Sequence, residues 1–575
     1  MGKVLVLGHD SRAFLSVIRS LGRGGLEVHA AWHNSDSVAL KSRYLRRAHV
    51  LPPYDETDDS WKPALIELMR RMRFDLIIPC PDPAVVALQR HRRELEPHGR
   101  LYVLNERAFD VLFDKLKTNE LARSVGVHLP REVLVTDVGQ AAPLVAQFGL
   151  PIVLKPRSSY NPDAPNSRLV VRKAYTEAAF CGLLEGMLGA GPVAVQENFI
   201  GSGVGVELLL KDGEPLLTFQ HLRVHEPLHG GGSAYRKAVP LSPELLEASL
   251  ALLRPLSYTG VAMVEFKQNL HTGDWVFMEV NARFWGSLPL ALAAGVDFPL
   301  ALYRLLVEGR DSFPQHYRPN VYCRNLFIDL SWQRANLKAD RTDPTLATRP
   351  IPRVIRDAVV NVATLREHLD TLTLDDPRPG LTELRQVAGR VASAIRWAVV
   401  RRCLPVRLIR RQLARRAVEA VRRADRVLFV CKGNICRSPF AEHLARERGL
   451  FADVASSGYY PVADRPSPEK AVDAASAWGV DLRAHRSRRL TEGQVSEADL
   501  ILVFDYDNYR QVVAECPSAR GRVHYAGVLE TSGPLFIEDP WGGGPERFER
   551  AFLQIERVIA AIVELRVTAP PVSCG

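Results

Sequence analysis

The stretch VCKGNICRSPFAE, residues 430–442, constrains the fold more than any other part of this chain. The apolar run VLFV before it is typical of a buried strand, and FAEHLARERG after it has the apolar spacing of an amphipathic helix. Ser438 suits the N-cap of that helix, and Pro439 suits its first helical position. The pattern therefore predicts a strand, a tight loop and a helix, with the loop at the helix N-terminus.

Four residues give this loop a chemical character. Free backbone N–H groups and the helix dipole at such a position favour binding of a phosphate dianion. The same field favours the thiolate form of Cys431, and the planar guanidinium of Arg437 can hold two phosphate oxygens at once. Gly433 and Asn434 tolerate the left-handed backbone that a tight loop needs. We therefore expect a nucleophile inside an anion cradle.

Hydrolysis of a phosphate ester also needs a proton donor for the leaving oxygen. Asp539, in the loop-like stretch IEDPWGGGPERF, is the candidate, and the neighbouring Trp541 could form an aromatic wall of the pocket. Taken alone, the pair Asp539-Pro540 more often marks an ordinary turn.

The motif CKGNICRSP, followed more than 100 residues later by EDPWG, resembles the signature of the low molecular weight protein tyrosine phosphatases. The resemblance extends over 426–566 and implies an α/β domain with a central parallel sheet. It implies that Cys431 is the nucleophile, Arg437 the phosphate clamp and Asp539 the general acid. Cys436 would be the partner able to form a reversible disulfide with Cys431. The residues expected to shape or support the loop are Lys432, Gly433, Asn434, Ile435, Cys436 and Ser438.

Two positions depart from the family pattern. Lys432 adds a cation at the pocket rim, which favours an acidic substrate, and Trp541 replaces the usual Tyr or Phe. Thiol-dependent arsenate reduction shares this fold, but it needs further cysteines, and only Cys516 is available. A pocket that has lost activity is a weaker alternative, because the nucleophile, clamp and acid are all present.

The hairpin VAMVEFKQNLHTGDWVFMEVNARFWGS, residues 261–287, indicates a metal site in the first half of the chain. If residues 271–273 form a three-residue loop with a left-handed glycine, Glu265 lies opposite Glu279. Two facing carboxylates repel each other unless a cation lies between them. Glu265, Glu279 and Asn281 are oxygen ligands suited to Mg²⁺. The alternative, a solvated hairpin with unrelated acids, is disfavoured by its apolar surroundings.

Residues upstream of this hairpin are candidates for nucleotide binding. Two lysines, Lys115 and Lys155, could neutralise a triphosphate. Gln196 and Glu197 follow a strand-like run and could face an adenine and a ribose.

This order of features over about 1–310 resembles the ATP-grasp superfamily, and MEVNARFWGSLPLALAAGVDFP is its most specific stretch. The closest resemblance is to the carbamoyl-phosphate-synthase-like and carboxylate–amine ligase branch. It implies that ATP with Mg²⁺, or Mn²⁺, activates a carboxylate as an acylphosphate that an amine then attacks. Arg283 would steady the acylphosphate or the substrate carboxylate. The first domain would help to bind the acceptor.

Residues 385–426 form a strongly basic segment. They hold thirteen arginines and two acids, a formal charge of +11, in a chain whose total is +10. Apolar residues at roughly helical spacing predict a helical connector, broken at Pro405. Its arginines could bind an anionic membrane surface or an acidic partner, or could pair with acids on both halves of the chain. No nucleic-acid fold signature accompanies them, so specific nucleic-acid binding is not predicted.

The sequence thus predicts an α/β protein in five parts. These are a pre-ATP-grasp domain (1–105), an α+β ATP-grasp domain (106–310), an irregular region with the Arg-rich helical connector (311–425), a phosphatase domain (426–566) and a disordered tail (567–575). We expect a bifunctional cytoplasmic enzyme whose substrates are a carboxylate and an amine on one side, and a phosphotyrosine protein or phosphomonoester on the other. In the alternative, only the phosphatase is active and the first half senses nucleotides.

Overall fold

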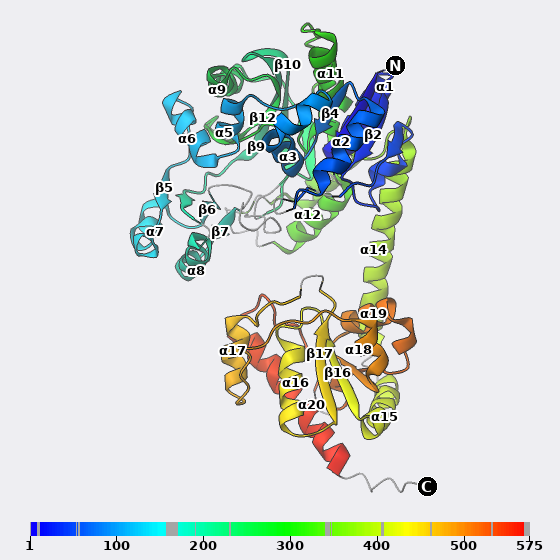
Figure 1. Ribbon diagram of the computed structural model, residues 1–575. Helices are drawn as coiled ribbons and strands as arrows, with labels where there is room; N and C mark the ends of the chain where they lie inside the picture. The colour runs from blue at the N-terminus through cyan, green and yellow to red at the C-terminus, as the bar shows by residue number, and fades with distance from the viewer. Residues whose placement is uncertain are drawn as a thin grey trace. The chain divides into compact units, whose positions relative to one another are not determined.

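The computed structural model divides the chain into two compact units, Met1–Val387 and Ala388–Gly575. Figure 1 shows both units, and each is described here by itself. The structure describes all residues except 1, 9–11, 53, 56–57, 157–170, 190, 229–231, 340–345, 347, 404–406, 461–462, 531–532 and 568–575.

The first unit begins with a parallel four-stranded sheet in the order β3-β2-β1-β4, as predicted for a small α/β domain. The apolar runs of β1 and β4 are almost wholly buried, because helices pack on a parallel sheet. Residues 100–105 form no strand, and Leu101 makes an isolated parallel bridge with Ile77 of β4. The elements are β1 (Lys3–Leu7), α1 (Arg12–Arg23), β2 (Glu27–Ala31), β3 (Leu45–Ala48), α2 (Trp61–Met72), β4 (Leu76–Pro79), α3 (Asp82–Arg90), α4 (Arg92–Leu95), α5 (Glu106–Leu112) and α6 (Lys115–Ser124).

A small antiparallel sheet follows, in the order β5-β8-β6-β7. Helices α7 and α8 cover it, and residues such as Phe180 and Leu184 of α8 are fully buried against it (Figure 1). The elements are β5 (Glu132–Val135), α7 (Ala142–Phe148), β6 (Ile152–Pro156), β7 (Arg172–Ala174), α8 (Glu177–Leu188) and β8 (Val193–Gln196).

A seven-stranded sheet forms the centre of the first unit, in the order β13-β12-β9-β10-β11-β14-β15. All neighbouring strands are antiparallel except β14 and β15, which are parallel. The elements are β9 (Ser202–Lys211), β10 (Glu214–His225), β11 (Tyr235–Ala238), α9 (Pro243–Leu253), β12 (Gly260–Gln268), β13 (Trp275–Asn281), α10 (Leu288–Ala294), α11 (Phe298–Glu308), β14 (Tyr322–Arg324) and β15 (Glu367–Leu369).

The region 311–380 is part of this unit, and the prediction that it is irregular was wrong. The short strands β14 and β15 extend the large sheet, and helices α12 (Leu326–Lys338) and α13 (Ile351–Ala363) lie between them. Pro350 is compatible with this helix because it is the N-cap of α13, where a missing N–H costs little. These three-residue strands are held by pairing, β14 with β11 and β15 with β14, which the local sequence does not reveal.

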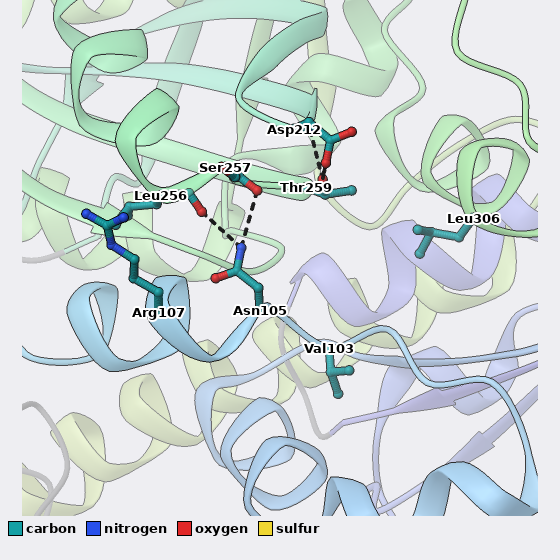
Figure 2. A pocket seen from close by; sticks show the side chains of 8 residues that line it. All are labelled: Val103, Asn105, Arg107, Asp212, Leu256, Ser257, Thr259 and Leu306. Carbon is teal, nitrogen blue, oxygen red and sulfur yellow. Dashed lines mark hydrogen bonds between the residues drawn. The ribbon is translucent and has the colours of Figure 1, made fainter.

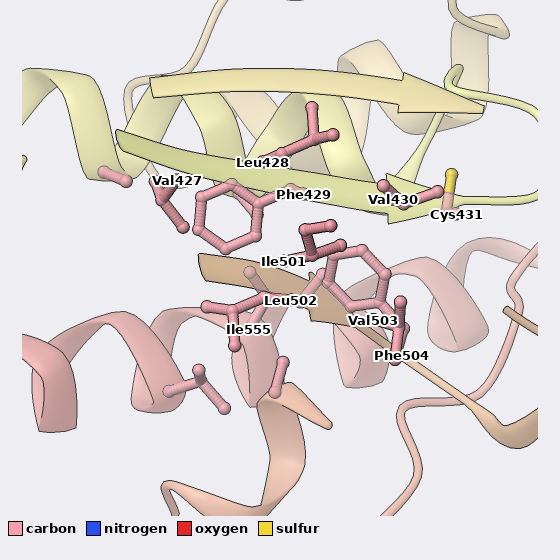
Figure 3. Packing of buried hydrophobic residues seen from close by; sticks show 14 of the residues in the cluster. Val427, Leu428, Phe429, Val430, Cys431, Ile501, Leu502, Val503, Phe504 and Ile555 are labelled. Atoms are coloured by element: carbon pink, nitrogen blue, oxygen red, sulfur yellow. The ribbon is translucent and has the colours of Figure 1, made fainter. Parts of the chain in front are cut away.

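The second unit holds a parallel sheet in the order β17-β16-β18-β19. Figure 3 shows its core, in which side chains of β16 and β18 pack against the long helix α20. The rings of Phe440 and Phe552 stack at 4.1 Å and join α16 to α20. The elements are β16 (Arg426–Cys431), α16 (Arg437–Glu447), β17 (Asp453–Gly458), α17 (Glu469–Ser476), α18 (Glu492–Glu497), β18 (Leu500–Val503), α19 (Tyr506–Glu515), β19 (Val523–Tyr525) and α20 (Pro545–Val567).

The Arg-rich segment is helical, as predicted, and forms α14 (Pro377–Cys403) and α15 (Arg407–Arg423). The predicted break at Pro405 lies outside the described residues. Helix α15 is built into the second unit: Ala417 and Val421 are fully buried in its core. Arg566 of α20 donates hydrogen bonds to the carbonyl oxygens of Val421 and Ala424.

Two further features of the helices are where the last one ends and how apolar they are in general. Helix α20 ends at Val567, the first residue of the predicted tail, and residues 568–575 lie outside the described part. In the described residues no single helix has the length and apolar composition to cross a membrane; only the bent pair α10 and α11 meets that test jointly.

The packing of α15 predicts a stability effect. Replacing Val421 by Ala leaves a small cavity between α15 and the core, which should cost about 2 kcal/mol. The urea concentration at the unfolding midpoint is measured on the full-length chain, with loss of aryl phosphate hydrolysis as the probe of unfolding of the second unit. The matched control is Leu408→Ala on the same helix, whose side chain is 76% exposed. Equal midpoints for the two variants would contradict the integration of α15.

Candidate functional sites

The thiol of Cys431 lies at the end of β16, directly before the loop (Figure 3). Helix α16 begins at Arg437, so the prediction that Ser438 is the N-cap and Pro439 the first helical residue was wrong by two positions. The hydroxyl of Ser438 does not cap the helix. It lies 3.0 Å from Cys431 Sγ and 3.0 Å from Asn434 Nδ2. Pro439 still fits, because the first N–H groups of a helix have no partner within it.

Asn434 organises the loop around the thiol. Its φ of 51° is left-handed, as predicted, and its backbone N–H points to Cys431 Sγ at 3.2 Å. Its side chain donates to Ser438 and to Ser456, and it accepts the backbone N–H of Arg488 at 2.7 Å. This set of bonds fixes both the backbone and the side chain of one residue, so the thiol faces a preformed N–H donor.

Gly433 does not adopt the predicted left-handed backbone. The space beside its Cα is crowded instead: an added Cβ would lie 3.2 Å from Arg465 Nη2 and 3.2 Å from Ile435 Cγ1. Arg465 also donates to the Gly433 carbonyl at 2.6 Å. Close approach of neighbours, rather than a positive φ, accounts for glycine here.

Arg437 is buried and held by two acids. Its Nη1 donates to Asp505 at 2.7 Å and to the Ile537 carbonyl at 2.9 Å, and its Nη2 lies 2.8 Å from Asp539. Burial lowers the pKa of Arg437, but the two carboxylates outweigh burial and raise it overall. Its Nε is buried and has no hydrogen-bond partner among the described residues. That N–H is a donor available to an anion beside Cys431.

The other predicted loop residues divide between core and rim. Ile435 and Cys436 are buried, and burial raises the pKa of the Cys436 thiol, with nearby Cys431 and Asp539 acting in the same direction. Lys432 is exposed, and Trp541 is 61% exposed. Cys431, Cys436 and Cys516 are all free thiols. The rim thus offers one cation and one indole to a bound substrate.

A buried acid that the sequence did not reveal supports the loop from below. Glu442 of α16 accepts a hydrogen bond from Ser456 at 2.5 Å and two from Arg488, at 2.8 and 2.7 Å. Arg446 donates to the same carboxylate. Burial raises the pKa of Glu442, but these hydrogen bonds outweigh it and lower the pKa overall. The chain Glu442–Ser456–Asn434 links the helix to the thiol loop.

In the first unit, the predicted pairing of Glu265 with Glu279 is confirmed by the register of β12 and β13. The loop that produces this pairing differs from the expected three-residue loop. Strand pairing ends at Gln268 and Trp275, so the loop is longer than three residues, although Gly273 is left-handed with a φ of 87°. A bulge next to Glu265 adds one residue to β13 and restores the facing position.

The donor set at this hairpin fits a hard divalent cation. Asn281 donates to Glu265 at 3.1 Å, and Lys115 Nζ lies 3.8 Å from Glu279. Burial raises the pKa of Glu265; Arg223 lowers it, and the charge of Glu279 raises it further. Two facing carboxylates and an amide oxygen, one of the carboxylates desolvated, are ligands that Mg²⁺ accepts. Among the described residues no cluster of three or more His, Cys, Asp or Glu side chains is placed to hold a metal, so the amide would be needed.

Lysines of the small sheet lie near this hairpin. Lys155 is buried, which lowers its pKa to about 8; Glu279 opposes the shift and Lys115 adds to it. Lys173, which the sequence analysis missed, pairs with Val153 and so shares a face with Lys155. Burial and the charge of Lys267 lower the pKa of Lys173 to about 8. Several desolvated cations therefore gather beside the two acids, as a polyanion site requires.

The remaining predicted residues of this unit have protein partners. Gln196 is buried and donates to Glu132, whereas Glu197 pairs with Arg131 Nε at 2.6 Å. Arg283 donates to Asp82 at 2.5 Å. Asp82 begins α3, so the first sheet domain, which was expected to help to bind the acceptor, supplies the partner of Arg283.

A separate open pocket of about 460 Å³ lies in the first unit (Figure 2). None of its lining residues is a predicted site residue. Asn105 donates to the carbonyls of Leu256 and Ser257, and Thr259 bonds with Asp212, so its polar groups largely satisfy one another. Its lining residues are Val103, Asn105, Arg107, Asp212, Leu256, Ser257, Thr259 and Leu306.

Comparison with known proteins identifies the second unit. Residues 426–567 match the family model of low molecular weight phosphotyrosine protein phosphatases. The probable low molecular weight protein-tyrosine-phosphatase EpsP of Ralstonia solanacearum is 36% identical over 137 residues, which cover 24% of this chain and 92% of that protein. Through its C-terminal unit, the chain belongs to the low molecular weight phosphotyrosine protein phosphatase family, as predicted.

The first unit is similar to solved structures of low sequence identity. The biotin carboxylase domain of 2-oxoglutarate carboxylase from Hydrogenobacter thermophilus is 17% identical, with a TM-score of 0.45, over 56% of this chain and 73% of that one. N5-carboxyaminoimidazole synthetase from Staphylococcus aureus is 14% identical, with a TM-score of 0.45, over 62% and 96%. The chemistry of the first unit therefore rests on its own side chains.

The buried acid below the thiol loop predicts a pH effect. The pKa of Glu442 is lower in the folded chain than its unfolded value of about 4.3, so its stabilising contribution is present above that pH and is lost as pH falls through the folded pKa. Glu442→Gln should lower the unfolding free energy at pH 7 by about 1–3 kcal/mol and flatten its acid dependence. Urea unfolding at pH 3–7 measures both, with the exposed Glu447→Gln as control. An unchanged acid slope in Glu442→Gln would refute this assignment.

Proposed function

We propose that the second unit hydrolyses phosphomonoesters, with phosphotyrosine as the substrate group, through a phosphocysteine intermediate. The observation that carries the proposal is the Cys431 thiol beside a preformed N–H donor and a buried guanidinium with a free Nε. Family membership and the name of the relative EpsP support tyrosine phosphate as the substrate.

Substrate binding would exchange partners of Arg437. Without substrate, Asp539 is paired with Arg437 at 2.8 Å. A phosphate dianion competes for the guanidinium and frees Asp539 to carry a proton, while Asp505 continues to hold Arg437 Nη1. The free Nε then donates to a phosphate oxygen.

The reaction would proceed in two displacements. The Cys431 thiolate attacks phosphorus, the bond to the ester oxygen breaks, and Asp539 gives its proton to that oxygen. Asp539, now a carboxylate, takes a proton from water as the water oxygen attacks the phosphocysteine. The sulfur–phosphorus bond breaks, which releases inorganic phosphate and restores the thiolate. The hydroxyl of Ser438, 3.0 Å from Sγ, can donate to the departing thiolate.

Two substitutions test these roles. Cys431→Ser should abolish hydrolysis of aryl phosphates, because the weaker hydroxyl nucleophile replaces the thiolate. Asp539→Asn should lower kcat about 10²–10⁴-fold for esters with poor leaving groups and less for p-nitrophenyl phosphate. Steady-state kinetics over a series of leaving groups measures both. Retained turnover in Cys431→Ser, or a uniform loss over the series in Asp539→Asn, would sink the mechanism.

For the first unit we propose a Mg-ATP-dependent ligase that activates a carboxylate as an acylphosphate for attack by an amine. The supporting observation is the gathering of Lys115 and Lys155 beside the facing pair Glu265 and Glu279. Glu265, Glu279 and Asn281 would hold Mg²⁺, which when bound neutralises charge on the phosphate oxygens. Mn²⁺ has the same preference for oxygen ligands and could substitute.

The chain's own residues would then perform the remaining work. Lys115 and Lys155 bind phosphate oxygens; burial lowers the pKa of Lys155 to about 8, and a bound phosphate would favour its charged form. Arg283, anchored by Asp82, orients the substrate carboxylate so that its oxygen attacks the γ-phosphorus and ADP leaves. The amine then displaces inorganic phosphate from the acylphosphate.

A second candidate for the first unit is a nucleotide sensor without turnover. The pairing of Arg283 with Asp82 favours it, because the group proposed to hold substrate already has a protein partner.

ADP release from the full-length chain separates the two candidates. In a panel of carboxylic acids and amines, the ligase should release ADP only with a matched pair. Glu279→Gln should lower that rate at least about tenfold by weakening metal binding, whereas Glu247→Gln, at an exposed position, should not. Tight binding of Mg-ATP without ADP release in any combination would favour the sensor.

A further inference from the structure

Arg223 of β10 reaches across the neighbouring strand β9 to the proposed metal ligands. The strands lie in the order β12-β9-β10, so Glu265 of β12 and Arg223 of β10 are separated by β9. Arg223 nevertheless donates to Glu265, and it pairs with Glu226 at 3.2 Å. Both Arg223 and Glu265 have side chains that are 14% exposed.

A glycine in β9 makes this crossing possible. A Cβ built on Gly203 would lie 2.6 Å from Arg223 Cδ and 3.2 Å from Arg223 Nε, so no side chain fits there while Arg223 holds this position. Gly205, which pairs with Glu265, leaves similar room for His221. The stretch GSGVGVE, residues 201–207, thus provides a gap at the start of β9 over which Arg223 of β10 approaches Glu265.

The charges around Glu265 explain what Arg223 does without a metal. Glu265 faces Glu279, and the two carboxylates repel each other across the ladder. Lys115 lies 3.8 Å from Glu279, and Arg223 supplies the charge that balances Glu265. Arg223 Nε is buried without a hydrogen-bond partner in the described part of the chain. The guanidinium therefore has one donor left to offer.

We propose that Arg223 is the counter-ion that stands in for the metal at Glu265, and that it turns to the nucleotide phosphates when Mg-ATP binds. The inference rests on the proposed ligase function. Arg223 donates to Glu265 Oε2 and Asn281 donates to Oε1, so a metal ion that took Oε2 would displace Arg223. Lys267 lies near Arg223, as their mutual charge effect indicates, and a phosphate chain would neutralise both cations.

The proposal predicts opposite effects on two ligands. In Arg223→Gln, Mn²⁺ alone should bind about tenfold more tightly, because Glu265 is no longer neutralised, whereas Mg-ATP should bind about tenfold more weakly. Mn²⁺ binding to the full-length chain is measured by electron paramagnetic resonance without nucleotide, and Mg-ATP binding by calorimetry. General damage to the fold would weaken both ligands, so opposite signs are specific to this role.

Three further variants sharpen the test. Arg223→Lys keeps the charge and should stay near wild type for Mn²⁺. Gly203→Ala keeps Arg223 but displaces it, and should shift Mn²⁺ affinity in the direction of Arg223→Gln. Arg254→Gln removes an exposed arginine, paired with Glu214 at 3.3 Å, and should change neither affinity.

The outcomes separate this inference from the ligase function. Wild-type protein that binds both ligands, with Mn²⁺ affinity unchanged or weaker in Arg223→Gln, would overturn the role of Arg223 alone. Wild-type protein that binds neither Mn²⁺ nor Mg-ATP would overturn the ligase function and this inference together.

Discussion

A buried guanidinium is stable only when an opposite charge lies beside it, and this constraint determines the arrangement of both candidate sites. Removing an ion from water costs several kcal/mol, so Arg437 and Arg223 are each held by two carboxylates. In each pair one acid is also a candidate for chemistry: Asp539 as proton donor and Glu265 as metal ligand. The ligand-free molecule is thus stabilised by pairs that a phosphate group would separate. In the proposed mechanisms, part of the binding energy would separate these pairs, and the released acid would become available when substrate is present.

The close approach of arginines also explains why glycine occurs at two positions near these sites. Gly203 and Gly433 both have unremarkable φ angles, yet both are crowded by an arginine, Arg223 and Arg465 respectively. In each case the absence of a Cβ lets a guanidinium approach backbone that any other residue would shield. Asn434 alone in the thiol loop uses the left-handed backbone, and it does so to aim its N–H at sulfur. Glycine here serves close approach, and asparagine serves conformation.

Features that depend on a short local motif were predicted correctly from the sequence. Features that depend on pairing between strands were not. Cys431, Arg437 and Asp539 come together as expected, because their motifs are short and specific. The facing acids Glu265 and Glu279 were predicted from an assumed loop, but a bulge produces the register. No local signal marks a bulge, since the extra residue is tolerated only through pairing across the ladder.

Partners contributed by other strands and domains were also missed, for the same physical reason. Arg223 and Asp82 lie 42 and 201 residues from the side chains they hold. An arginine on a strand and an acid at a helix start are ordinary in sequence, and only the fold gives them a role. The spaced glycines of GSGVGVE were the one available signal, because two glycines at alternate positions of an otherwise apolar strand leave a gap on a single face.

The Arg-rich segment shows how composition can mislead about location. The segment was expected to be a connector between the two halves, yet α15 buries Ala417 and Val421 in the phosphatase core. Arg410 of that helix donates to the Glu530 carbonyl, so one arginine serves internal structure, while Arg411 and Arg415 remain exposed. The family match begins at residue 426, after this helix. Helix α15 therefore supplements the family's core with a packed layer whose outer face is cationic, and any partner of those arginines would contact the folded phosphatase unit rather than a free linker.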